Sequence, residues 1–225
     1  GSYALSAVAT DGAGNVSAPS AAFALTIVAA DSAAPVLQAF SSTTADGVYG
    51  PGAAITLVAS FDEALAAGSS LTVVLDNGAS VVLSKVYGAT VSGVYTVGAT
   101  GSGADSADLT VASIAAMAVS DGAGNLQGAT ALPASNLGDT SALVVDTTAP
   151  PAPAVTGISE DTGASASDGV TDDNTLVISG TAEAGSSVEV RLDGVAIGTV
   201  QADGAGAWSL DHSGTVLAEG SYALS

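Results

Sequence analysis

Basic residues are almost absent from this sequence of 225 residues, which has 2 Lys and Arg residues, 22 Asp and Glu residues and a formal net charge of −20. A surface that binds nucleic acid needs clustered lysine and arginine, and attraction to anionic membranes depends on the same residues. The charge balance therefore excludes nucleic acid and anionic membrane surfaces as partners. The partner that suits so many carboxylates is a cation.

Cysteine is also absent, so the fold has no disulfide and no thiolate chemistry. No run approaches the ~18 consecutive apolar residues of a membrane span. The single histidine, His212, and the serines near it lack a nucleophile-elbow context. Neither a P-loop nor an HExxH motif occurs. We therefore expect no catalytic residues.

Short runs rich in β-branched residues, separated by Gly, Asp, Asn and Ser, predict β-strands along most of the chain. The sequences DNG (76–78) and LDG (192–194) contain the Asn-Gly and Asp-Gly pairs that are typical of two-residue β-hairpin turns. The Ala-rich segment 60–68 is short, and we expect a loop there. Turns every ~8–12 residues are typical of an all-β sandwich. The predicted strands are 53–60, 71–78, 79–86, 175–180, 187–194 and 195–200.

The sequence repeats itself. The hexapeptide GSYALS occurs at residues 1–6 and again at 220–225, a spacing of 219 residues from the first Gly1 to Gly220. Self-similarity at a fixed period is the signature of a tandem array. The segments 28–37 and 144–153 share a second pattern, in which an apolar run is followed by Asp, a short spacer and Ala-Pro, and we interpret both as interdomain linkers.

These anchors predict three parts. Residues 31–148 form one complete sandwich domain of the size expected for seven strands. Residues 149–225 hold the first strands of a second domain, and residues 1–30 hold its last two strands (F and G). Linkers of a few residues cannot span the ~30 Å of a strand-length domain, so we expect residues 1–30 of one copy to complete 149–225 of the next copy, head to tail.

The chain resembles the bacterial Ig-like domains of giant repetitive adhesins, of the RTX type and BapA-like. The resemblance rests on ISGTAEAGSSVEV (178–190), ADGAGAWS (202–209) and ATDGAGNVS (9–17), and more weakly on FDEAL (61–65) and VSDGAGN (119–125). It implies tandem Ig-like antiparallel β-sandwiches of Greek-key topology. It also implies an extracellular rod on the bacterial cell surface, secreted by a type I route, with roles in adhesion and biofilm and without catalysis.

In a sandwich of this kind the B–C and F–G loops lie beside the incoming linker, so acidic residues from three segments meet at one pole. Ca²⁺ takes about 6–8 hard oxygen ligands, and it suits such a site better than Mg²⁺ does. Each residue taken alone could be an ordinary turn former, because Asp and Asn cap turns, but the same constellation at matched places in both units favours calcium. One predicted calcium set is Asp31, Asp62, Glu63, Asp121 and Asn125, and the other is Asp146, Glu183, Asp11 and Asn15.

A further acidic stretch, residues 159–174, is either a cation loop or a solvated acidic loop, and it lacks the EF-hand spacing. Four other aspartates are expected to be surface charges only: Asp105, Asp108, Asp139 and Asp203. The candidate ligands in the acidic stretch are Glu160, Asp161, Asp168, Asp172 and Asp173.

Together these observations predict a calcium-rigidified spacer repeat of a large adhesin, with calcium ions and neighbouring copies as partners. A carbohydrate- or surface-binding module is the alternative that an exposed aromatic patch beside the acidic stretch would favour. An accessory repeat of a secreted hydrolase or of a surface-layer protein stays open as well.

Overall fold

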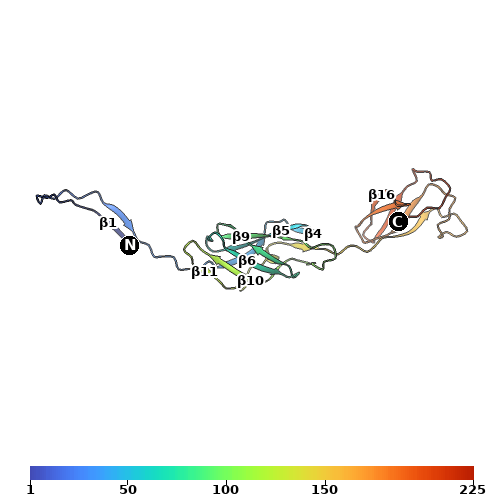
Figure 1. Cartoon of the computed structure of the whole chain (residues 1–225). Helices are drawn as coiled ribbons and strands as arrows, with labels where there is room; N and C mark the ends of the chain where they lie inside the picture. Colours follow the sequence, from blue (N-terminus) through green and yellow to red (C-terminus); the bar gives the residue numbers. More distant parts are fainter. The chain divides into compact units, whose positions relative to one another are not determined.

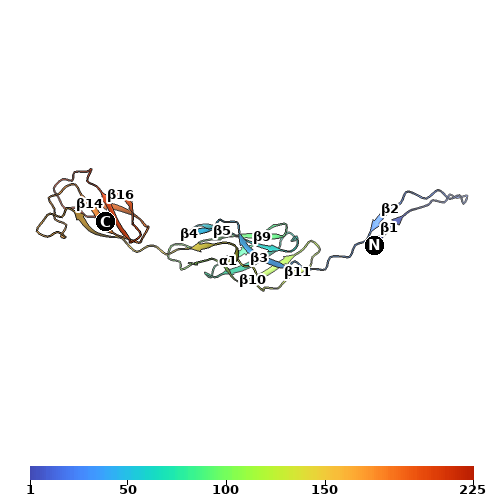
Figure 2. The same ribbon diagram turned by 180° about the vertical axis from the view of Figure 1, so that it is seen from behind.

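The computed structural model describes all 225 residues, and these form two compact units, Gly1–Thr147 and Thr148–Ser225 (Figures 1 and 2). The first unit contains an N-terminal hairpin and a β-sandwich, and the second contains five strands. The chain is all-β apart from one short helix. That helix has neither the length nor the apolar composition that a membrane crossing would require.

The N-terminal hairpin pairs β1 (Ser2–Leu5) with β2 (Phe23–Thr26) in antiparallel register. Tyr3 lies opposite Leu25 and Leu5 lies opposite Phe23. Side chains alternate between the two faces of a strand pair, so these four apolar residues share one face. Ser2, Thr26, Ala4 and Ala24 share the other. Both faces are exposed, and Phe23 is 67% exposed.

Two antiparallel sheets of four strands make up the sandwich. The first has the order β3 (Leu37–Ser42), β5 (Ala54–Phe61), β9 (Thr90–Thr96), β8 (Lys85–Tyr87). The second has the order β11 (Leu126–Gln127), β10 (Val111–Ser120), β6 (Ser70–Leu75), β7 (Ser80–Leu83).

A separate pair of strands runs parallel: β4 (Gly47–Tyr49) and β12 (Leu143–Val145). The helix α1 (Leu137–Thr140) precedes β12 and begins at a capping box. In it, the Asn136 side chain accepts from the Leu137 amide, and the Asp139 carboxylate accepts from the Asn136 amide.

The predicted strand 79–86 is wrong in one respect, because it divides at Ser84 into β7 and β8, which belong to different sheets. The Ser84 amide donates to the Ser92 carbonyl of β9 (3.0 Å). From Ser84 through β9 the chain is therefore paired within the first sheet and no longer with the second. The prediction of a loop in the Ala-rich segment 60–68 is confirmed from residue 62 onward, since β5 ends at Phe61 and the next element, β6, begins at Ser70.

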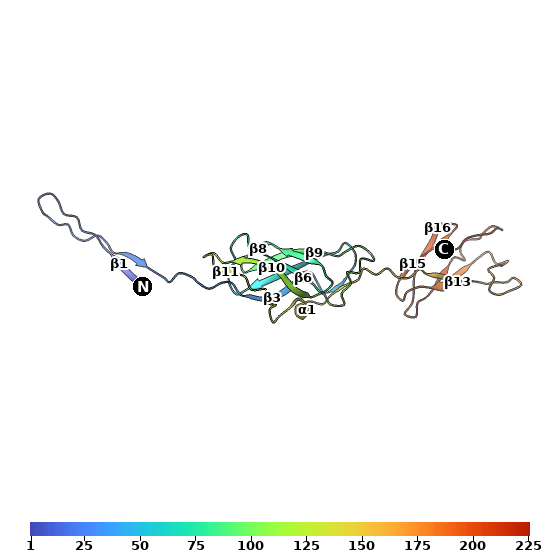
Figure 3. The same cartoon turned by 60° about the horizontal axis from the view of Figure 1, so that its bottom comes forward.

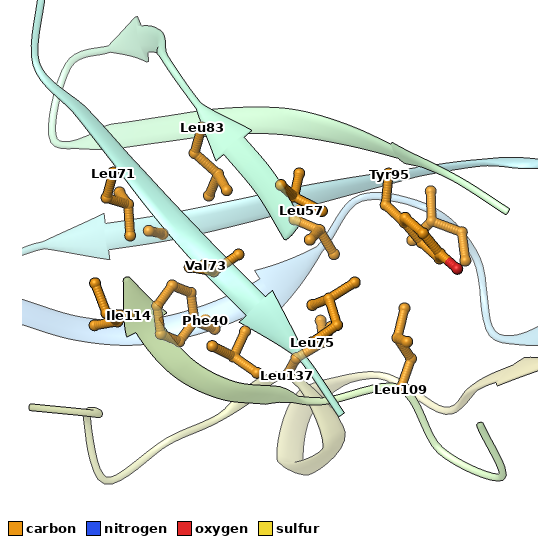
Figure 4. Packing of buried hydrophobic residues seen from close by; sticks show 14 of the residues in the cluster. Phe40, Leu57, Leu71, Val73, Leu75, Leu83, Tyr95, Leu109, Ile114 and Leu137 are labelled. Atoms are coloured by element: carbon orange, nitrogen blue, oxygen red, sulfur yellow. The ribbon is translucent and has the colours of Figure 1, made fainter. Parts of the chain in front are cut away.

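The core of the sandwich lies between the two sheets (Figure 4). Leu71, Val73 and Leu75 extend inward from β6, and Phe40 and Leu57 reach the same cluster from the opposite sheet. Leu137 of α1 is fully buried at the edge of this cluster. Along β5 and β6 buried residues alternate with more exposed ones, which is the period of two of a strand with one face on the core.

The second unit contains two smaller sheets (Figure 3). One has the order β13 (Ala154–Ser159), β14 (Val177–Thr181), β17 (Ala207–Asp211), and the other pairs β15 (Ser187–Leu192) with β16 (Val195–Gln201). Ile178 and Trp208 from the first sheet and Val188 and Val190 from the second form one buried cluster. The unit is therefore also a sandwich.

The packing generates a stability prediction. Leu75 is 1% exposed at the centre of the first core, so Leu75→Ala should lower the free energy of unfolding of the sandwich by about 2–5 kcal/mol. Val82→Ala on the neighbouring strand, at a side chain 58% exposed, should change it little. Denaturant unfolding followed on both variants tests this, and equal effects would contradict the assignment of the core.

Candidate metal centre

The loop 121–125 between β10 and β11 is closed by its own aspartate. Asp121 Oδ1 accepts from the amides of Ala123 (2.9 Å) and Asn125 (2.8 Å), and Asp121 Oδ2 accepts from Asn125 Nδ2 (2.7 Å). The Gly124 amide donates to the Asp121 carbonyl, and Gly124 has a φ of +91°, which glycine adopts without steric cost. Asp121 is thereby held rigidly, with its side chain 3% exposed.

The loop between β5 and β6 lies against this turn. Leu65 and Asp121 form an isolated antiparallel β-bridge, and the Ala66 amide donates to the Ser120 carbonyl (2.7 Å). Asp62 binds the incoming linker, because its Oδ1 accepts from the Val36 amide (2.7 Å) and its own amide donates to the Val36 carbonyl (3.1 Å). These bonds place Glu63 between the linker and Asp121.

Three carboxylates meet at this point. The oxygens of Asp31, Glu63 and Asp121 all lie within 4.8 Å of one another, and no other group of three acidic or histidine side chains in the chain is so close. Asp31 comes from the linker and is exposed, Glu63 is half-buried and Asp121 is buried. The site thus joins one linker residue to two loops of the sandwich.

The electrostatics of the group are those of an uncompensated negative cluster. Burial and, after it, the charges of Asp31, Asp121 and Asp62 raise the pKa of Glu63. The pKa of Asp121 is lowered, first by the hydrogen bond from the Asn125 side chain. The ion pair of the chain joins Arg191 to Glu189, so it does not involve this group.

The donor set fits a hard divalent cation. Carboxylate oxygens are the ligands that Ca²⁺ prefers, and three of them supply part of the 6–8 positions it takes. Bidentate carboxylates, carbonyls and water commonly supply the others. Soft metals are poorly served here, since the chain contains no cysteine and His212 lies in the second unit.

Of the first predicted set, the structure therefore gathers Asp31, Glu63 and Asp121. The Asn125 side chain donates a hydrogen bond to Asp121, and the Asp62 carboxylate accepts one from the linker backbone. These two residues therefore hold members of the cluster in place without belonging to it.

The members of the second predicted set lie in separate parts of the chain. Asp11 and Asn15 lie in the hairpin, Asp146 follows β12 and Glu183 lies in the second unit. Asp11 nevertheless forms the same turn as Asp121, with Oδ1 accepting from the amides of Ala13 (2.9 Å) and Asn15 (2.8 Å). Its role as a ligand stays a prediction.

The acidic stretch forms the connection between β13 and β14, and its carboxylates mostly bind the stretch itself. Asp161 Oδ2 accepts from the Gly169 amide (2.9 Å), Asp168 Oδ1 from the Val170 amide (3.1 Å), and Asp173 Oδ1 from the Thr175 amide (2.9 Å). Asp172 bonds the Thr162 hydroxyl, and the Glu160 amide donates to Asp173. No three of these carboxylates converge, and metal binding there also stays a prediction.

A third turn of the same type was missed by sequence reasoning. Asp203, expected to be a surface charge, accepts through Oδ1 from the amides of Ala205 (2.8 Å) and Ala207 (2.9 Å) between β16 and β17. The shared tetrapeptide DGAG at 121–124 and 203–206 was the available signal. Because this third turn belongs to no carboxylate cluster, the turn alone does not make a metal site.

Asp105, also expected to be a surface charge, fixes the end of the first unit. Its Oδ1 accepts from both the amide and the hydroxyl of Thr147 (2.6 Å each), and the Gly101 amide donates to the Thr147 carbonyl (2.7 Å). Thr147 is 1% exposed.

Comparison with known families adds one match. Residues 147–225 match the family model described as a bacterial Ig-like domain. This segment is similar to bacterial Ig-like domains. A search of curated proteins found no match to the chain. The Ig-like segment covers the second unit, while the carboxylate group lies in the first.

The raised pKa of Glu63 generates a prediction about metal-free protein. A carboxyl with a raised pKa in the folded state adds stability at low pH that is lost as the pH rises through that pKa. At neutral pH and without divalent cations, Glu63→Gln should therefore raise the melting temperature of the sandwich. It should also reduce the fall in melting temperature between low and neutral pH. Thermal unfolding between pH 4 and 8 in chelator tests it, with Glu219→Gln in the second unit as the control that leaves the sandwich unchanged.

Proposed function

We propose that this chain is a calcium-binding spacer segment built from Ig-like sandwiches, in which a cation at Asp31, Glu63 and Asp121 fixes the linker to the domain that follows it. The observation that carries the proposal is the convergence of a linker carboxylate with two loop carboxylates within 4.8 Å. Three like charges at this distance repel one another unless a cation lies among them.

The proposed mechanism is a change in linker stiffness. Asp31 is held locally by a hydrogen bond from the Ala33 amide (3.1 Å), and Val36 is already bonded to Asp62. A cation that binds Asp31 together with Glu63 and Asp121 would restrain the backbone between these two points. Binding to the folded state alone also adds stability, by about 2.7 kcal/mol at a calcium concentration 100 times Kd.

The extracellular setting is part of the proposal. Support comes from the bacterial Ig-like match at residues 147–225, from a second sandwich in the same chain and from the net charge of −20. Such a segment would act as an extender of a bacterial surface adhesin that holds a binding region away from the cell.

A role in carbohydrate binding finds less support. A cleft of ≈ 820 Å³ lies beside the acidic stretch, lined by Asp168, Asp172 and Leu217 among others, and Tyr222 is the one aromatic residue in its wall. The Tyr222 hydroxyl donates to the Ala218 carbonyl (2.8 Å), a bond to upstream backbone typical of the start of strand F in Ig-like sandwiches. We therefore assign this tyrosine a structural role.

Calcium titration of the full chain tests the proposal. We expect calcium to raise the melting temperature of the first sandwich and to slow hydrogen exchange of the amides at residues 31–36. Asp31→Asn and Glu63→Gln should each weaken calcium binding at least about tenfold, since each removes a charged ligand. Asp203→Asn alters the matched turn outside the cluster and should leave calcium binding to the sandwich unchanged.

Two outcomes would reject this function. One is a melting temperature and exchange pattern that do not respond to millimolar calcium. The other is a calcium response that Asp31→Asn and Glu63→Gln leave intact, because the cation would then bind elsewhere.

A further inference from the structure

The segment at the end of the first sandwich pairs along both of its edges. The Val145 amide donates to the Ser106 carbonyl (2.8 Å), and the Ser106 amide donates to the Val145 carbonyl (2.9 Å). On the other edge the Asp146 amide donates to the Tyr49 carbonyl at the end of β4 (3.1 Å). Successive residues of a strand present their backbone groups to opposite edges. Residues 145–147 therefore lie between β4 and the loop that joins β9 to β10.

The regular pairing with that loop stops at the next position. Val145 and Ser106 form an antiparallel bridge, and continuing its register would place Thr147 opposite Ala104. The Ala104 carbonyl accepts instead from Asn77 Nδ2 (2.9 Å). The Thr147 amide is therefore bonded to a different acceptor.

That acceptor is the side chain of Asp105. Its Oδ1 accepts from both the amide and the hydroxyl of Thr147 (2.6 Å each), and the Gly101 amide donates to the Thr147 carbonyl (2.7 Å). Thr147 is 1% exposed, so its amide and hydroxyl are shielded from water. A buried donor that loses its partner carries its full desolvation cost. The conformation of Thr147 therefore depends on this one carboxylate.

The loop that carries Asp105 is held to the sandwich on both sides of this residue. On one side Asn77 binds the Ala104 carbonyl, and on the other the Ser106 hydroxyl donates to Asp76 Oδ2 (2.7 Å). Asp76 and Asn77 lie in the turn between β6 and β7 of the second sheet. The backbone at Asp105 therefore cannot follow a movement of the linker without breaking these bonds.

We propose that Asp105 is a latch for the exit of the sandwich. It holds residues 145–147 in one conformation by hydrogen bonds alone, so that the linker at 148–153 starts from a fixed point whether or not calcium is present. Every bond that carries this role lies within the first unit. The latch goes beyond the cation site at Asp31 and does not rest on it.

The chemistry of the latch differs from that of the cation site. Asp31, Glu63 and Asp121 lie with their oxygens within 4.8 Å of one another, and their repulsion favours a cation among them. At the exit one carboxylate faces two donors, and such charge-assisted hydrogen bonds are roughly twice as strong as neutral ones. Each carboxylate oxygen has two lone pairs, and on Asp105 Oδ1 the two donors of Thr147 occupy both.

The latch has a consequence for the spacer role, and this consequence rests on the proposed function. A linker would be held to the domain before it by hydrogen bonds and to the domain after it by a cation. Removal of calcium would then loosen the linker only on the side of the domain that follows.

Hydrogen exchange of the full chain, measured in calcium and in chelator, tests the proposal. The Thr147 amide should exchange equally slowly in both conditions, while the amides at 31–36 report separately on the cation site. Asp105→Ala should speed the exchange of the Thr147 amide at least about tenfold, because this amide loses its acceptor. The amides of β5 in the core should keep their rates.

Two further variants separate the latch from a general loss of stability. Asp108→Ala removes the same charge from the same loop, and the distance from Asp108 Oδ1 to the Leu143 amide is 3.4 Å, at the limit of a hydrogen bond. It should leave the exchange of the Thr147 amide unchanged. Asp105→Asn keeps a side-chain oxygen acceptor, and it should restore most of the protection that Asp105→Ala removes.

A spin label gives a second readout at the start of the linker. The chain contains no cysteine, so Ala149→Cys provides a single labelling site at an exposed position. We expect the motion of the label to be equally restricted in calcium and in chelator. Asp105→Ala should increase its mobility in both, and Asp108→Ala should not.

Two results would overturn the proposal. Chelator could speed the exchange of the Thr147 amide as it does at residues 31–36, which would make the exit dependent on a cation. Asp105→Ala could leave both the Thr147 amide and the spin label unchanged, which would assign the exit to another contact. If calcium fails to protect residues 31–36 while Thr147 stays protected, the cation site is rejected and the latch is supported.

Discussion

The pairing of β10 with β6 is the interaction on which the first sandwich and its carboxylate group depend. It gives the second sheet its central strand, and its end presents Asp121 to the loop that carries Glu63. The corresponding pairing in the second unit extends only over residues 223–225. The same element of topology is thus used in both units.

Negative charge is tolerated in this fold because most aspartates have donors of their own. The pKa values of Asp11 and Asp121 are lowered first by the hydrogen bond from the asparagine side chain of the same turn and then by backbone amides, and the pKa of Asp203 is lowered by backbone amides, that of Ala207 first. Glu63 lacks such donors, and burial together with the charges of Asp31, Asp121 and Asp62 raises its pKa. The contrast separates carboxylates that stabilise turns from one whose ionisation opposes folding unless a cation compensates it.

Much of this arrangement could be predicted from the sequence, because strands with a period of two and hairpin turns are local properties. Runs rich in β-branched residues between turn residues located β5, β6, β15 and β16, and the matched loops suggested that Asp31, Glu63 and Asp121 would meet. The division at Ser84 could not be predicted, since it depends on a bond to a strand that follows later in the chain. The helix α1 is only one turn long, and its capping residues look like those of any polar loop.

The parallel pair β4–β12 has a mechanical consequence for the spacer role proposed above. Strand β4 lies early in the sandwich, and β12 lies just before Thr147, the last residue of the first unit. The Thr147 amide donates a hydrogen bond to Asp105, which holds this end of the chain to the sandwich. When parallel strands near the two ends are pulled apart along their length, their hydrogen bonds bear the load together, in shear, whereas peeling would break them one after another. The domain would therefore resist stretching more strongly than its thermal stability alone suggests.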